Sequence, residues 1–92
     1  MDKNMAAVTL ENVQHDQLAI SIGRAIVLAN AVARQNGVTP ANCIISVAQE
    51  LDAGRTWRVH YGPRDYANRR GGDLIVLVDE ESESIQRVTR GQ

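Results

Sequence analysis

The chain has 92 residues and a mass of 10.1 kDa, the size of one small domain. Hydrophobic residues make up 43% and charged residues 23%, a balance typical of folded globular proteins and not of disordered ones. The net charge of −1 and the pI near 6.1 argue against general binding to nucleic acid or to an anionic membrane, so we expect neither as a partner.

The single cysteine and the N-terminal residues indicate the cellular location. Cys43 cannot form an internal disulfide, which favours a reducing compartment. Met1–Asn4 lacks the basic and apolar runs of a signal peptide, and no apolar stretch in the sequence is long enough to span a membrane. We therefore expect a cytoplasmic protein.

The first predicted element is a long helix over residues 14–36, preceded by a frayed segment over residues 1–13. Its apolar side chains recur at steps of four and three, which places them on one helix face; they are Leu18, Ile22, Ala25, Ala29 and Val32. Asn36-Gly37 predicts a left-handed stop, and Thr39-Pro40 forbids continuation. We expect Gly23, inside the helix, to permit a close approach to a sheet.

After the helix the apolar period changes to two, which predicts an antiparallel sheet within residues 43–90. The first strand alternates through Ile45 and Val47, and the second alternates through Trp57, Val59 and Tyr61. Residues 74–78 are apolar without alternation, which predicts a central strand covered on both faces. A last short strand is expected over residues 85–89.

One helix followed by strands with tight connections predicts an α+β fold. We expect a single domain over residues 1–92, in which the N-terminal helix packs on a four-stranded antiparallel meander, as in cystatin-like and NTF2-like folds. Ile45, Val47, Trp57 and Val59 are expected to face the helix.

Catalytic, metal and cofactor signals are weak, and we expect no such site. His15 and His60 lack further ligands at metal-binding spacing. Cys43 opens an apolar strand, where a small core residue is the plainer interpretation. Gly71-Gly72 precedes a strand and not a helix, unlike phosphate-binding loops.

Charge is distributed unevenly along the C-terminal half. Residues 55–70 carry five Arg and one Asp, whereas residues 73–83 carry five acidic residues and no basic one. Arg and Tyr are enriched at protein interfaces, so we predict partner binding through one set of side chains: Arg58, His60, Tyr61, Arg64, Tyr66, Arg69 and Arg70. The competing interpretation is that the arginines lie over an exposed sheet and pair with the acidic turn.

Three segments of the C-terminal half carry a family resemblance: Thr56-Trp57-Arg58-Val59-His60-Tyr61-Gly62-Pro63, Arg70-Gly71-Gly72-Asp73-Leu74-Ile75-Val76-Leu77-Val78-Asp79 and Ile85-Gln86-Arg87-Val88, with the terminal Arg90-Gly91-Gln92. This pattern resembles small bacterial immunity proteins with an NTF2-like fold, and the helix-then-meander order is shared with cystatin-like and PepSY-like domains. Members of that family usually have an Asp-x-x-x-Gly turn. Here no Gly follows Asp79 in the turn.

The resemblance implies a non-catalytic protein that binds a cognate protein toxin and blocks it by occlusion. Two alternatives stay open. The chain could be a homo-oligomeric adaptor, such as a homodimer that pairs through an edge strand or the exposed sheet face. It could also be a small NTF2-like ligand-binding protein or enzyme, with a pocket around a buried titratable group such as Asp79 or His60.

Overall fold

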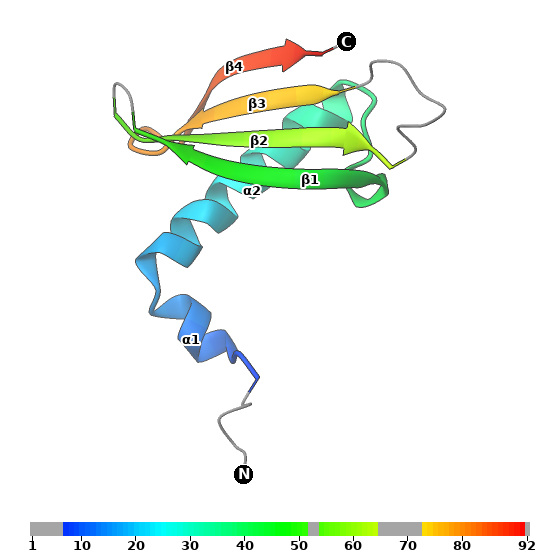
Figure 1. The fold of residues 1–92 in the computed structure, drawn as a ribbon. Coiled ribbons are helices and arrows are strands. Elements are labelled where there is room, and N and C mark those ends of the chain that lie inside the picture. The colour runs from blue at the N-terminus through cyan, green and yellow to red at the C-terminus, as the bar shows by residue number, and fades with distance from the viewer. Residues whose placement is uncertain (1–6, 52–53, 65–72, 92) are drawn as a thin grey trace.

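Four strands form one antiparallel sheet, and a long helix lies across one of its faces (Figure 1). The computed structural model describes residues 7–51, 54–64 and 73–91. The strands lie in the sheet in chain order: β1 (Cys43–Glu50), β2 (Thr56–Pro63), β3 (Leu74–Asp79) and β4 (Ser84–Arg90). The predicted α+β class, with its N-terminal helix and four-stranded meander, is confirmed.

The helical part differs from the prediction because it is divided. α1 (Leu10–Gln14) begins at Thr9, which forms a reciprocal capping box with Asn12, so part of the segment expected to be frayed is helical. α2 (Gln17–Gln35) begins afresh at Asp16, whose carboxylate accepts a hydrogen bond from the Ala19 amide at 2.9 Å. A cap residue has non-helical backbone angles, which explains the break between the two helices.

The predicted stop of α2 is confirmed. Gly37 has a φ of 76°, and the Val38 amide donates to the Ala33 carbonyl at 2.8 Å, the pattern of a glycine C-cap. A short 3₁₀ turn, η1 (Pro40–Asn42), then leads into β1.

The core lies between α2 and the two central strands. Its buried residues are Ala25, Ala29, Ala33, Trp57, Val59, Tyr61, Leu74, Val76 and Val78. Alanines one turn apart let the helix axis approach the sheet closely, since each adds only a methyl group to the contact. The prediction that Gly23 permits this close approach is wrong. Gly23 is exposed, and a Cβ built there has no atom within 4 Å.

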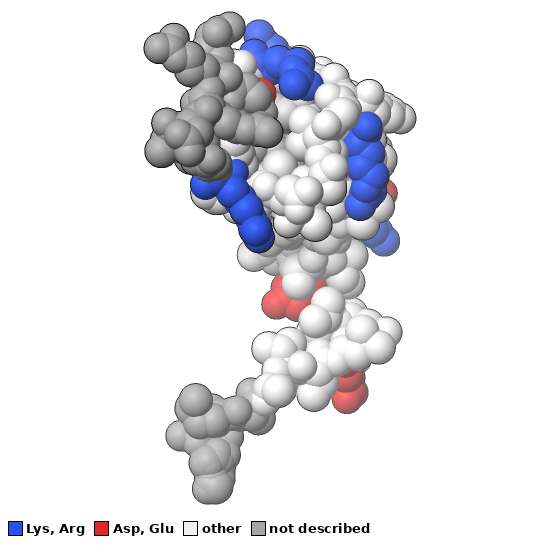
Figure 2. Space-filling view, turned by 90° about the vertical axis from the view of Figure 1, so that its right-hand side faces the viewer, with Lys and Arg blue, Asp and Glu red and all other residues white. Residues whose placement is uncertain are grey.

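Coverage of the sheet is uneven. α2 packs on β2 and β3 and then passes beyond the β1 edge, so that α1 lies outside the outline of the sheet (Figures 1 and 2). Ile45 and Val47, expected in the core, therefore keep 40% and 37% of their surface exposed. Leu18, one heptad before the buried Ala25, is 52% exposed. The helix is longer than the sheet that it covers.

β3 is central, as predicted, but the prediction that both of its faces are covered is wrong within the described residues. Leu74, Val76 and Val78 are buried under α2, whereas Ile75 and Leu77 on the opposite face are only partly buried. That face has no second layer among the described parts of the chain.

Over these same residues, no helix is both long enough and apolar enough to cross a lipid bilayer.

Candidate partner-binding surface

Two hydrogen bonds fix the position of α2 on the sheet. The Trp57 indole donates to Ser21 Oγ at 3.0 Å, and the Tyr61 hydroxyl donates to Asn30 Oδ1 at 2.7 Å. These bonds join positions nine residues apart on α2 to positions four residues apart on β2, so together they set where the helix lies on the sheet.

Tyr61 belongs to this covered face, which corrects its assignment to the partner-binding set. Its side chain is fully buried, and burial raises the pKa of its hydroxyl to about 12. Tyr61 shares the face of Trp57 and Val59 because strand side chains alternate. Tyr61 is therefore a core residue, and we leave it out of the proposed surface.

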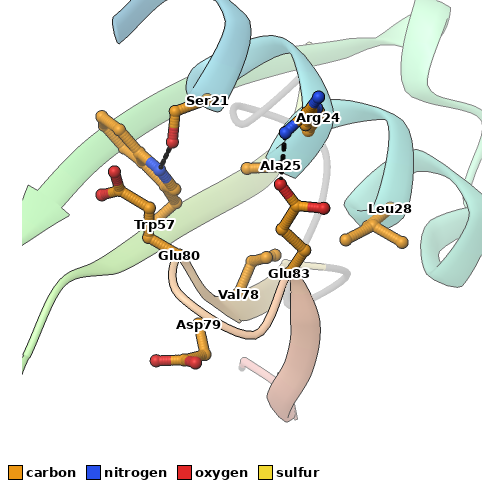
Figure 3. Close-up of a pocket in the computed structure, with 9 residues that line it drawn as sticks. All are labelled: Ser21, Arg24, Ala25, Leu28, Trp57, Val78, Asp79, Glu80 and Glu83. Carbon is orange, nitrogen blue, oxygen red and sulfur yellow. Dashed lines mark hydrogen bonds and ion pairs between the residues drawn. The ribbon is translucent and has the colours of Figure 1, made fainter. Parts of the chain in front are cut away.

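A small cavity lies at the end of the helix–sheet interface (Figure 3). Its volume is about 10 Å³, which is the space of a single water molecule. Glu80 Oε1 is buried at this cavity and has no hydrogen-bond partner among the described residues, while Glu80 Oε2 accepts from Arg55 at 3.3 Å. One water bonded to Oε1 would satisfy that atom. The cavity is too small to hold a metabolite.

The acidic turn beside the cavity serves the fold. Asp79 accepts hydrogen bonds from the hydroxyl and the amide of Ser82, which lower the pKa of the Asp79 carboxyl. Glu83 has a left-handed φ of 53° and pairs with Arg24 of α2 at 2.5 Å. Glu83 thus occupies the position of the Gly in the Asp-x-x-x-Gly turn.

No described part of the chain covers the opposite face of the sheet, which we call the open face. Ile75 and Leu77 form its apolar centre on β3, and they lie directly across from His60 and Arg58 of β2. Arg87 of β4 lies across from Leu77 on the other side. Apolar side chains surrounded by arginines are typical of the centre of a protein interface. We call this set the open-face cluster: Arg58, His60, Ile75, Leu77 and Arg87.

Two members of the open-face cluster lie beside carboxylates, one in a close contact and one in a long one. His60 Nε2 lies 2.6 Å from Asp73 Oδ2, and both side chains are about three-quarters buried. Arg58 Nε lies 3.8 Å from Glu50 Oε2, and both of these side chains are 42% exposed. A pair so long and exposed adds little to stability. The Arg58 guanidinium can exchange Glu50 for a carboxylate of a partner at small cost.

The remaining predicted site residues do not gather on this face. Arg64 is exposed just beyond the end of β2, whereas Tyr66, Arg69 and Arg70 lie outside the described residues. Arg55 and Arg64 flank opposite ends of β2, about 30 Å apart along the strand. In Figure 2 the basic side chains form separate groups and no continuous patch.

The sequence interpretation missed the apolar half of the open face. Ile75 and Leu77 were assigned to a doubly covered strand, although the strict alternation of the neighbouring β2 indicated a sheet with one solvent face. Asp73, which holds His60, comes directly before β3, and no local pattern links it to a residue thirteen positions earlier.

In the part of the chain that the structure describes, no three His, Cys, Asp or Glu side chains come together in a group suited to a metal ion. Comparison with family models, with curated proteins and with solved structures finds no match for this chain. The functional conclusion therefore depends on the geometry of the open face.

Proposed function

We propose that this protein is a non-catalytic binding module of the bacterial immunity kind, which neutralises a cognate protein toxin by covering part of its surface. The observation that carries the proposal is the open-face cluster, in which partly buried apolar side chains lie between arginines, with no second layer over them among the described residues. The family resemblance of the C-terminal half supplies the biological role.

The dimensions of the open face suit such a contact. Four neighbouring strands of six to eight residues give a face about 19 Å wide and about 20–27 Å long, or roughly 470 Å² in projection. A standard interface buries about 800 Å² of accessible surface on each partner. A corrugated sheet face has more accessible than projected area, so the open face supplies most of what a specific complex needs.

The chemistry of the face defines the partner. Ile75 and Leu77 favour an apolar side chain at the centre of the contact, and Arg58 and Arg87 favour carboxylates beside it. The partner surface is therefore apolar at its centre and acidic around it. Binding covers that surface, and no chemical step on the partner is needed.

The direct test measures binding to the product of the gene that adjoins this one, by titration calorimetry and native mass spectrometry. The same pair is co-expressed in bacteria to measure protection of growth. We expect a one-to-one complex and restored growth. Absence of binding together with absence of protection would remove the proposal.

Two variants locate the contact. Leu77→Asp and Arg58→Ala should each weaken binding at least about tenfold, because each removes an apolar or charge-assisted contact from the centre of the interface. Arg24→Ala is the matched control, since Arg24 is also an exposed arginine in an exposed ion pair but lies on the helix side. Equal affinities for all three variants would place the contact elsewhere.

A further inference from the structure

β1 is an edge strand without the usual protection of an edge. Within the described residues it is hydrogen-bonded on one side only, to β2. Natural edges are commonly blocked by charged residues, proline or bulges. β1 has eight residues, and its one charged residue is Glu50, at its end. β4, at the other edge, carries Arg87 and Arg90 and pairs with β3 through a bulge.

The helix extends past this same edge. The apolar stripe of α2 is buried at Ala25 and continues to Leu18, which is 52% exposed and lies under none of the described strands. The radius of gyration is 15.3 Å, whereas a compact domain of this length has about 12 Å. One chain therefore has an edge strand that pairs on one side only. Beside it lies the N-terminal end of α2, which none of the described strands covers.

We propose that a second copy of this chain fills both places, with β1 pairing antiparallel to β1 of the other copy about a two-fold axis at Ser46. The result is a continuous eight-stranded sheet, twice the four strands of one chain. The end of α2 that extends past the edge of each copy then covers the helix face of β1 in the other copy.

The residues of β1 fit this pairing with themselves. In the register centred on Ser46, Ile45 lies opposite Val47, and Ile44 lies opposite Ala48, so apolar side chains meet on both faces. Glu50 lies opposite Asn42, so no like charges face each other. A two-fold axis perpendicular to the sheet keeps both helices on the same side, and the contact is closed.

The helices also avoid each other in this arrangement. Ser21 bonds to Trp57, which pairs with Gln49, so α2 leaves the sheet near the C-terminal end of β1. The two-fold axis places the second helix near the opposite end of the strand pair. Ile45 and Val47, which are partly exposed in one chain, then lie between the sheet and the helix of the other copy.

The first test is the mass of the purified protein in solution, by size-exclusion chromatography with light scattering across a dilution series. We expect twice the 10.1 kDa of one chain, falling to one chain on dilution. A mass of one chain at every concentration would overturn the proposal, and would leave the open-face proposal standing, because no residue of the open-face cluster lies on β1.

The second test uses the position on the axis, where a residue meets its own copy. Ser46 is exposed in the single chain, so a charge there is compatible with the fold, as circular dichroism will check. Ser46→Lys and Ser46→Glu should each give single chains, because like charges then meet. Mixing the two variants should restore a dimer that native mass spectrometry identifies as mixed.

Thr89→Lys and Thr89→Glu are the matched controls, since Thr89 is exposed on β4, the other edge strand. Both should remain dimers. Leu18→Ser should weaken the dimer at least about tenfold, because it removes apolar surface from both copies. Dimeric Ser46 variants, a mixture that stays as single chains, or dissociation of the Thr89 variants would each contradict the proposed contact.

Discussion

The two faces of β3 differ in environment although their side chains are alike. Leu74, Val76 and Val78 are buried beneath α2, whereas Ile75 and Leu77 lie partly buried on the open face, over which the described residues form no layer. Five consecutive apolar residues thus divide into a core and a surface. A strand that is apolar on both faces thus indicates contacts on both faces, but the contact on one face can be made with another molecule.

The largest expected difference in stability between the two faces of the sheet is at β2. Trp57→Ala should lower the free energy of unfolding by about 3–5 kcal/mol, since it removes a buried indole and leaves Ser21 without its donor. Arg58→Ala, one residue along on the open face, should change it by less than about 0.5 kcal/mol. Urea unfolding followed by circular dichroism measures both. A Trp57 variant as stable as the wild type would mean that the covered face is wrongly assigned.

The same contrast can be tested within β3. Val76→Ala should cost about 2 kcal/mol, because Val76 is fully buried and its loss leaves a cavity. Leu77→Ala removes more carbon atoms, but from a partly exposed side chain, and should cost about 1 kcal/mol or less. If Leu77→Ala is the more damaging of the two, the open face is covered within the chain itself.

A pH series probes the covered face through Tyr61. Its pKa in the folded protein is about 12, above the ordinary value of 10.0, so folding favours the neutral hydroxyl. The resulting stabilisation is fully present below pH 10 and is lost as the pH rises towards 12. Tyr61→Phe should unfold more easily at neutral pH but lose less stability between pH 10 and 12. Parallel pH curves for the two proteins would show that Tyr61 is accessible to water.

The smallest effect is expected on the solvent side of α2. Gly23→Ala should stabilise the protein by about 0.5–1 kcal/mol, since the helix is favoured and the added methyl group meets no neighbour. Ala29→Gly, on the covered side, is the comparison and should destabilise it. A loss of stability in Gly23→Ala would indicate that this side of the helix is covered.

The sequence predicted the helices and strands, and the side of each that faces the core, because both depend on residues close together in the chain. The helix period, the glycine stop and the alternation of Trp57, Val59 and Tyr61 are properties of neighbouring residues. How much of each sheet face is covered by another element does not depend on neighbouring residues alone. Whether Ile45 and Val47 are buried depends on where α2 crosses the sheet, and that position is set by Trp57 with Ser21 and by Tyr61 with Asn30.

The candidate site was predicted in part for the same reason. Arg58 and His60 were correctly placed on the polar side of β2, because that follows from alternation. Ile75, Leu77 and Asp73 join them only through the pairing of β2 with β3. The three arginines of the sequence cluster that the structure describes, Arg55, Arg58 and Arg64, are dispersed, because an extended strand places residues farther apart than a helix of the same number of residues does.

The turn at Glu83 has a consequence for the order in which the protein folds. A glycine there would let β3 and β4 close as an independent hairpin, whereas a left-handed glutamate costs about 1–2 kcal/mol locally. Its carboxylate pairs with Arg24 of α2, fifty-nine positions earlier, but both side chains are exposed and the pair offsets only part of this cost. The rest must come from packing of β3 beneath α2, which favours cooperative folding of the whole chain over stepwise assembly from its C-terminal end.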